Sequence, residues 1–339
     1  MQKDNDETIT ASLTTPDNLT LFQTLNMLAS DCYNYCAIET SSHGIVQDRL
    51  NGLKFKAAGF TSFSQDHLDY HDNMEDYFNS KCKLFEDYLT DDALVVISMQ
   101  VFANYPIAEK LKNINYLVIE RDIKILELKS SLDKQKITFE YLGEQYSFET
   151  NIIGRFQIDN MLVAIFLVHH LGFALNQIVK VMPRVIEAAG RLQKINNQEG
   201  FNIFVDYAHT PDALRFVLKE LKSLTSGKLF VVFGCGGDRD RSKRKIMGEI
   251  AYEYADGVII TDDNPRSEDA ASIRKEIIQN FSEFIEIASR KSAIEHAIIL
   301  LKKGDTLIVA GKGHENYQVI KSEKIYFNDI EVIKSCLKN

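Results

Sequence analysis

The sequence is poor in the residues that would support a disulfide-rich, zinc-ribbon or membrane protein. Among 339 residues it has no tryptophan, five prolines and five cysteines, and no Cys-x-x-Cys pair. Neither a disulfide framework nor a zinc ribbon is therefore expected. The longest strongly apolar run, at 161–168, is too short to span a bilayer, and the N-terminal residues lack the apolar core of a signal peptide. These features predict a cytoplasmic globular protein without membrane contact.

Positive charge is also in deficit. The chain has 39 Lys and Arg against 48 Asp and Glu, a formal net charge of −9. This balance argues against a nucleic-acid partner, although a local basic site remains compatible with it. Hydrophobic residues make up 45% and charged residues 26%, as in folded proteins generally. At about 150 residues per domain, the length predicts two domains.

Short apolar runs alternate with amphipathic segments, the pattern of an α/β protein with a mainly parallel sheet. Thr15 is expected to cap a first helix, with a proline in its first turn. The first half predicts strands at 35–39, 57–61, 93–97 and 116–119. It predicts helices at 74–89 and 158–171, and a hairpin at 136–149. The second half predicts strands at 203–205, 229–233, 258–260 and 306–309, separated by helices at 212–224, 244–254, 270–281 and 292–302. We expect a domain with a parallel or mixed sheet at 1–188 and a Rossmann-like α/β domain at 189–339.

Polar segments follow most of these predicted strands, and many contain glycine. They lie at 39–43, 64–71, 206–212, 234–240, 262–266 and 311–315. Ligands of open parallel sheets bind beyond the carboxyl ends of the strands, so these segments are candidate sites. Packing alone does not account for so many polar residues at these positions.

Two interpretations remain open for the acidic and histidine residues of the first half. Glu39 with Asp66, His67, Asp69 and His71 could form a divalent-metal site. Carboxylates with one imidazole suit Mg²⁺ or Mn²⁺ better than Zn²⁺. Alternatively, these are solvated loop residues and helix caps.

The glycine-rich and arginine segments of the second half also leave alternatives. Residues 234–241 could form a backbone nest for an anion, or a tight turn that needs glycine for positive φ. They are no dinucleotide fingerprint, because Arg239 stands where that motif needs glycine. Arg266 follows a proline in an extended loop, where it could bind a carboxylate or form a surface salt bridge with Glu268 or Asp269.

Taken together and in this order, the segments resemble the Mur ligases of peptidoglycan synthesis. The resemblance rests on TTPD at 14–17, ETSSH at 39–43, DHLDYH at 66–71, DYAHTPD at 206–212, GGDRDRSKR at 236–244, DNPR at 263–266 and GKGHE at 311–315. It covers nearly the whole chain, and it is strongest to the members that use diaminopimelate. It implies a P-loop-NTPase-like central domain, and a reaction in which ATP phosphorylates the D-glutamate carboxylate of UDP-N-acetylmuramoyl-L-alanyl-D-glutamate. The amino group of meso-2,6-diaminopimelate then attacks the acyl phosphate, which gives an amide, ADP and phosphate.

The resemblance also implies roles for individual residues. Mg²⁺ would be bound by Glu39, His67 and Lys81, with Lys81 carbamylated and with His67 and Lys81 as catalytic residues. The implied precursor-binding residues are Thr14, Thr15, Ser41, Gln47 and Arg49. The implied ATP-binding residues are Arg191, Asp206 and Asn160. The implied diaminopimelate-binding residues are Arg239, Asp263, Asn264, Arg266, Gly311 and Glu315. The expected partners are the UDP-linked dipeptide, diaminopimelate and ATP, and a monomer is expected.

The sequence departs from the family pattern in its nucleotide motifs. The family carries a UDP-binding domain and a GxxxxGK[ST] phosphate loop before the TTPD segment, whereas Gly-Lys occurs here only at 227–228 and 311–312, outside such a loop. Gln157 stands where asparagine is usual, and residues 98–101 lack a usual polar segment. We therefore expect an N-terminally truncated ligase with impaired ATP binding, or a non-catalytic module that binds precursor and amino acid. A metal-dependent hydrolase would explain none of the C-terminal motifs, and DNPR argues against a folylpolyglutamate synthase.

Overall fold

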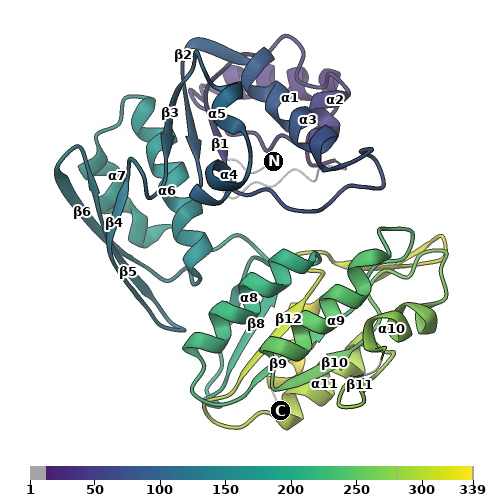
Figure 1. Ribbon diagram of the computed structural model, residues 1–339. Coiled ribbons are helices and arrows are strands. Elements are labelled where there is room, and N and C mark those ends of the chain that lie inside the picture. Colours follow the sequence, from purple (N-terminus) through teal and green to yellow (C-terminus); the bar gives the residue numbers. More distant parts are fainter. Residues whose placement is uncertain (1–12, 280, 338–339) are drawn as a thin grey trace. The chain divides into compact units, whose positions relative to one another are not determined.

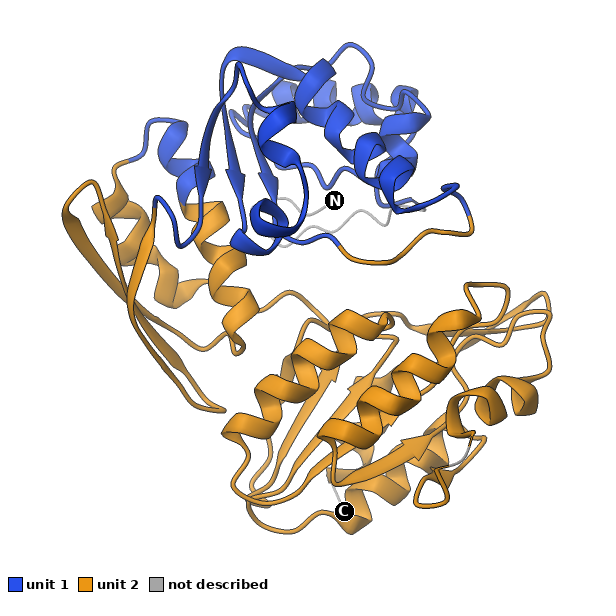
Figure 2. Ribbon diagram, in the orientation of Figure 1, with its two compact units in different colours: residues 1–63, 70–122, 166–173 blue, residues 64–69, 123–165, 174–339 orange. Residues whose placement is uncertain are grey.

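The computed structural model describes residues 13–279 and 281–337 (Figure 1). The chain forms two compact units built from interleaved stretches (Figure 2). Unit 1 contains residues up to 63, 70–122 and 166–173, and unit 2 contains 64–69, 123–165 and 174 onwards. In the described part of the chain, no helix has the length and apolar character needed to cross a membrane. The domain division at residue 188 stays a prediction.

Unit 1 is built on a parallel three-stranded sheet in the order β1-β2-β3. Its strands are β1 (Phe55–Phe60), β2 (Leu89–Ile97) and β3 (Asn115–Val118). Its helices are α1 (Asn18–Ser30), α2 (Ser42–Val46), α3 (Met74–Asp87), α4 (Met99–Asn104) and α5 (Ile107–Lys110). An aromatic core joins α3 to the sheet: the Phe78 ring lies 5.5 Å from Phe63 and 6.3 Å from Phe60. Burial in this core raises the pKa of the Cys82 thiol to about 12, so that group is a packing residue.

Two predictions for unit 1 are wrong. Asp17, not Thr15, caps the first helix, and its carboxylate accepts a 3.0 Å hydrogen bond from the Thr20 N–H. The helix consequently begins at Asn18, and Thr15 is buried before it. Residues 35–39 are irregular and mostly exposed instead of forming a buried strand. An apolar run forms a strand only where another strand pairs with it. Among the described residues, no strand pairs with this segment.

Unit 2 contains a small antiparallel sheet with the order β4-β5-β6. Its strands are β4 (Lys124–Ser130), β5 (Gln135–Tyr141) and β6 (Glu144–Thr150), and the last two form the predicted hairpin. β4 was not expected, because its side chains are largely exposed and form no apolar run. The predicted long helix is α6 (Arg155–His170), which crosses from unit 2 into unit 1 and is followed by Gly172 with φ +100°. The helix α7 (Leu175–Val181) and the 3₁₀ turn η1 (Met182–Arg184) come next.

The larger sheet of unit 2 has six strands in the order β11-β10-β9-β12-β8-β7, all parallel except the edge strand β7. The strands are β7 (Gln193–Ile195), β8 (Asn202–Asp206), β9 (Leu229–Phe233), β10 (Gly257–Ile260), β11 (Ile285–Glu286) and β12 (Thr306–Ala310). The helices are α8 (Pro211–Leu224), α9 (Ser242–Tyr254), α10 (Ala270–Ile278), α11 (Arg290–Leu300) and α12 (Asp329–Leu337). A hairpin of β13 (Tyr317–Ile320) and β14 (Glu323–Tyr326) precedes α12. The four strands predicted for this half are confirmed.

Helices cover both faces of this sheet, which makes a three-layer α/β/α arrangement (Figure 1). Alternate strand residues supply the two cores: Phe204 packs with α8, α9 and α10, whereas Ile203 and Val205 pack with α11 and α12. Because the strands are buried on both faces, their sequences are continuous apolar runs. The loops that follow the parallel strands therefore gather at one edge of the sheet.

Candidate active site

The loops after β9 and β10 pack directly against each other. The Gly237 N–H donates to the Asn264 carbonyl at 2.9 Å, and a Cβ on Gly237 would lie 2.0 Å from the Pro265 carbonyl oxygen. Close approach thus explains the glycine at position 237. The alternative of a positive φ at the glycines of this turn is wrong, since the positive φ of this turn belongs to Asp238, at +54°. The loop geometry leaves room for no side chain at residue 237.

Arg266 is held in place through its backbone and one edge of its guanidinium. Its φ is +51°, its N–H donates to the Val319 carbonyl at 3.0 Å, and its Nη1 donates to the Gly237 carbonyl at 2.7 Å. Glu268, considered above as its salt-bridge partner, instead pairs with Arg244 at 2.8 Å. Among the described residues, Arg266 makes no other side-chain hydrogen bond, so Nε and Nη2 can donate to an anionic ligand.

The other residues predicted to bind diaminopimelate lie next to this arginine. Asn264 Nδ2 donates to Glu315 Oε2 at 3.1 Å, and the Asp263 carboxylate accepts from the Asn264 N–H at 2.7 Å. A Cβ on Gly311 would lie 3.1 Å from Asp263 Oδ2, so the glycine loop after β12 contacts the same carboxylate. The structure thus brings together five of the six predicted residues, and their shared role in ligand binding stays a prediction.

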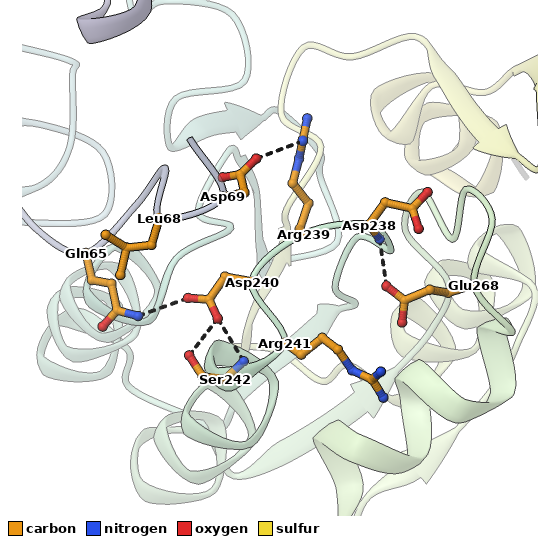
Figure 3. Close-up of a pocket in the computed structure, with 9 residues that line it drawn as sticks. All are labelled: Gln65, Leu68, Asp69, Asp238, Arg239, Asp240, Arg241, Ser242 and Glu268. Carbon is orange, nitrogen blue, oxygen red and sulfur yellow. Dashed lines mark hydrogen bonds and ion pairs between the residues drawn. The ribbon is translucent and has the colours of Figure 1, made fainter. Parts of the chain in front are cut away.

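The sixth, Arg239, lines a pocket of 460 Å³ in unit 2 (Figure 3). Its Nη1 lies 3.2 Å from Asp69 Oδ2, and Gln65 Nε2 donates to Asp240 Oδ2 at 2.9 Å. The lining residues are Gln65, Leu68, Asp69, Asp238, Arg239, Asp240, Arg241, Ser242 and Glu268. A wall with charges of both signs is suited to a zwitterionic ligand.

Glu268 remains ionised at this pocket over the whole physiological range. The hydrogen bond from the Arg244 guanidinium lowers the pKa of Glu268 from 4.5 to about 2, against a smaller opposing effect of burial. A further hydrogen bond, 2.6 Å from the Asp238 N–H, acts in the same direction. The Arg244 side chain is 1% exposed, so this pair fixes the pocket wall from inside the unit.

The residues considered for a metal site do not assemble in the described part of either unit. Unit 1 holds Glu39 and Lys81, with Lys81 Nζ 5.1 Å from the Tyr77 ring centroid, whereas His67 belongs to unit 2. Within residues 13–279 and 281–337, no group of three or more His, Cys, Asp or Glu side chains could hold a metal ion. His71 is hydrogen-bonded through both ring nitrogens to neighbouring side chains. The Mg²⁺ site and the carbamylated lysine therefore stay predictions, and no chemical step is derived through them.

Asp66 instead forms an anionic centre beside two imidazoles of unit 2. Its Oδ2 lies 3.6 Å from His209 Nε2 and 3.7 Å from His67 Nε2. Burial alone would raise the pKa of Asp66, but the hydrogen bond with His209 and the charge interactions with both histidines hold it well below the usual range. The carboxylate is therefore ionised at neutral pH.

Unit 1 brings together four of the residues predicted to hold the UDP-linked precursor. Thr15 is buried, and its Oγ1 donates to the Glu39 carbonyl and accepts from the Ser41 N–H, both at 2.9 Å. Arg49 Nη1 donates to the Thr15 carbonyl at 2.7 Å, and Arg49 Nη2 donates to Gln47 Oε1 at 2.5 Å. The cluster keeps hydroxyl, amide and guanidinium groups on one surface. The adjacent residue, Thr14, is exposed.

Of the three residues predicted to bind ATP, Arg191 and Asp206 lie close together in the structure, because Asp206 bonds the backbone beside Arg191 and Arg191 lies over the ring beside Asp206. Asp206 is 5% exposed, and its two oxygens accept from the backbone N–H groups of residues 192 and 208. Burial raises the pKa of Asp206. The Arg191 guanidinium lies 4.6 Å from the Tyr207 ring centroid, and Asn160 Nδ2 donates to Gln157 Oε1 at 3.2 Å. Asp206 thus fixes local backbone, and nucleotide contacts at these residues stay predictions.

Two charged pairs near the candidate site, each with a fully buried cation, were not predicted. Lys312, in the GKGHE segment, is fully buried and pairs with Glu315 at 2.9 Å. Arg290 pairs with Asp329 at 2.8 Å, and both side chains are 0% exposed. Charged residues are seldom buried, and no prediction from the sequence singled these pairs out. The position of Lys312 two residues after a fully buried strand was the one available signal.

Comparison with known proteins gives matches along most of the chain. Residues 2–168 match the family model described as Mur ligase middle domain, and residues 190–313 match Mur ligase, glutamate ligase domain. The UDP-N-acetylmuramoyl-L-alanyl-D-glutamate--2,6-diaminopimelate ligase of Rickettsia conorii (strain ATCC VR-613 / Malish 7) is 45% identical over 334 residues, which are 96% of this chain and 69% of the relative. The ligase of the same name from Rickettsia bellii (strain RML369-C) is 46% identical over 337 residues, or 97% and 70%. A solved structure of a ligase with this name has a TM-score of 0.64 at 36% identity, and the match covers 95% of this chain and 68% of that one.

Proposed function

The chain belongs to the Mur ligases, a family of ATP-dependent ligases, and we propose that it adds meso-2,6-diaminopimelate to UDP-N-acetylmuramoyl-L-alanyl-D-glutamate. In this reaction ATP phosphorylates the D-glutamate side-chain carboxylate, and the amine of diaminopimelate displaces the phosphate. A carboxylate is a poor electrophile, and phosphorylation gives it a leaving group. Mg²⁺, when bound, would offset the negative charge of the phosphates.

The availability of the Arg266 guanidinium is the observation that carries this proposal. Nε and Nη2 remain able to donate to a ligand, and the Glu315 carboxylate belongs to the neighbouring cluster through Asn264. The distal end of diaminopimelate carries a carboxylate and an amine, which match these two groups in charge. Lysine lacks the distal carboxylate and would leave the half-buried guanidinium without an anionic partner, at a cost of about 1–3 kcal/mol.

The remaining roles follow from the same proposal. The precursor would bind at the unit 1 cluster of Thr15, Ser41, Gln47 and Arg49 and at the adjacent Thr14. Glu39, His67 and carbamylated Lys81 would bind Mg²⁺, and Arg191, Asp206 and Asn160 would contact ATP. These assignments are supported by the family match and by the gathering of four precursor residues in unit 1. A cytoplasmic monomer stays a prediction.

Binding without turnover is a second candidate function. The 339 residues contain no GxxxxGK[ST] segment, whose backbone and lysine hold ATP phosphates in P-loop proteins. The amino-acid site within unit 2 does not involve such a segment. A chain of this kind would recognise diaminopimelate and precursor but transfer no phosphoryl group.

Two measurements on the full chain test the proposal and separate the candidates. Phosphate release is measured with ATP, Mg²⁺, the UDP-linked dipeptide and diaminopimelate, with omission of each substrate as the control. Release that depends on all of them supports the ligase. Absence of release, together with calorimetric binding of meso-diaminopimelate but not L-lysine, supports the binding module. Equal binding or use of lysine and diaminopimelate contradicts the assignment of Arg266.

A further inference from the structure

Lys312 carries a fully buried and paired amine beside the candidate amino-acid site. It lies in the loop after β12, its side chain is 0% exposed, and its Nζ is 2.9 Å from Glu315 Oε2 and 3.3 Å from Asn264 Oδ1. A buried ammonium is stable only when it is paired and hydrogen-bonded, and among the described residues these are its side-chain acceptors. The positions of its two acceptors, Glu315 and Asn264, are therefore fixed as firmly as that of the lysine itself.

The same contacts use three of the four hydrogen-bonding positions of the Asn264 side chain. Its Oδ1 accepts from Lys312 Nζ and from the Val319 N–H at 2.9 Å, and its Nδ2 donates to Glu315 Oε2. Both donors to Glu315 therefore bond the same oxygen, Oε2. Oε1 is then the Glu315 oxygen that these two donors do not use. The loops after β10 and β12 and the start of β13 all meet at this one ammonium.

We infer that Lys312 is a positioning residue, which holds Glu315 and Asn264 in the one arrangement that receives the amine of the incoming amino acid. The inference rests on the proposed function. Lys312 does not touch the ligand, because its side chain is fully covered by protein. It acts through Glu315: the ammonium fixes Oε2, and Oε1 then faces the ligand with its orientation already set. Preorganisation of this kind increases affinity because less ordering is left for the binding step.

The chain offers a matched control for the charge of this residue. Lys324, on β14, places its Nζ 4.6 Å from the Tyr317 ring centroid, whereas Lys312 Nζ lies 5.6 Å from the same ring. Lys324 is exposed and forms none of the ion pairs seen in the described residues. Lys324→Met thus removes an ammonium beside the same tyrosine without touching Glu315 or Asn264.

Calorimetric titration of the full chain with meso-diaminopimelate tests the inference in two backgrounds. Lys312→Met is expected to raise Kd by about tenfold or more in the native background and by less than about twofold in a Glu315→Gln background. Lys324→Met is expected to leave Kd unchanged. Lys312→Gln, whose amide can still donate to Glu315, is expected to fall between Lys312→Met and the native chain, and it serves as the test if the methionine variant does not fold.

Each result decides one of the two proposals. Equal weakening by Lys312→Met or Lys312→Gln in both backgrounds shows a general structural effect and overturns the positioning role, as does an unchanged Kd. A native chain that does not bind diaminopimelate overturns the proposed function, and the inference with it. Native binding with unchanged variants overturns the inference alone.

Discussion

The buried pair of Arg290 and Asp329 joins three elements of unit 2 below the candidate site. Arg290 begins α11, Asp329 begins α12, and both side chains are 0% exposed. Arg290 Nε and Nη2 each donate to one Asp329 oxygen at 2.8 Å, and Nη2 also donates to the Ala310 carbonyl, at the end of β12, at 2.9 Å. We predict that Asp329→Asn strongly destabilises this part of the unit.

The magnitude follows from the two charge-assisted hydrogen bonds. At about 1.5–3 kcal/mol each, they account for about 3–6 kcal/mol, and the general cost of removing one partner of a buried pair is about 3–5 kcal/mol. Asparagine retains one acceptor oxygen but leaves the Arg290 charge without compensation. Arg290 Nη1 already has no hydrogen-bond partner among the described residues, so the buried guanidinium has few other contacts that could compensate for the lost charge. We expect a loss of about 3–5 kcal/mol.

Hydrogen exchange of α11 and α12 peptides in increasing urea measures this loss locally, which avoids assuming a single transition for two units. The control is Glu295→Gln, which removes an exposed pair with Lys291 on the same helix at 3.8 Å and is expected to cost less than about 0.5 kcal/mol. Replacing both partners, as Arg290→Met with Asp329→Leu, is expected to recover much of the loss. A cost below about 1 kcal/mol for Asp329→Asn would refute the reasoning that this buried charge depends on its partner.

Three further predictions concern the loops of the candidate site. Gly237→Ala is expected to lower stability by about 1–3 kcal/mol in urea unfolding, because its Cβ would lie 2.0 Å from the Pro265 carbonyl oxygen; an unchanged midpoint contradicts the close approach. The folded-state pKa of Glu268, about 2, lies below its ordinary value of 4.5, so its pair with Arg244 stabilises the fold above about pH 4.5 and this contribution is lost as pH falls toward 2. Solvent screening reduces it to about 1–2 kcal/mol, and Glu268→Gln should flatten that part of the stability–pH curve; an unaltered slope contradicts it. Arg266→Ala is expected to weaken calorimetric binding of meso-diaminopimelate by about tenfold or more while costing about 1 kcal/mol of stability, and a native-like Kd contradicts its role.

The sheet of unit 2 could be predicted from the sequence because its strands are buried on both faces. Continuous apolar runs occur at 229–233, 258–260 and 306–309. A half-exposed strand would instead alternate apolar and polar residues, so these runs indicate strands that are buried on both faces. The exposed elements gave no such signal: β4 is largely exposed with charged and apolar residues interspersed, and the β13–β14 hairpin faces solvent along β14. The segment 35–39 shows the opposite error, since its apolar run is not matched by a paired strand among the described residues.

The candidate amino-acid site was predicted from motifs, but its supporting charges were not. Asp263, Asn264, Arg266, Gly311 and Glu315 come from two segments about 50 positions apart, and the topology of parallel strands explains why they meet. Burial of a lysine cannot be inferred from its neighbours in sequence, because it depends on loops that fold over it from elsewhere. Composition and spacing identify which groups can bind a ligand, whereas tertiary packing decides which of them are already used by the protein.

That distinction would explain how the proposed site could be rich in charge and still be selective. In the described part of unit 2, the cations nearest the site are committed: Arg244 to Glu268, Arg290 to Asp329 and Lys312 to Glu315. Arg266 differs from them, because its only side-chain bond there is to a carbonyl, which leaves its positive charge unneutralised. A carboxylate-bearing ligand therefore gains an ion pair at Arg266 without displacing one already made. A ligand without that carboxylate would form no ion pair at Arg266, so under the proposed function the discrimination would rest on one guanidinium held in place by its neighbours.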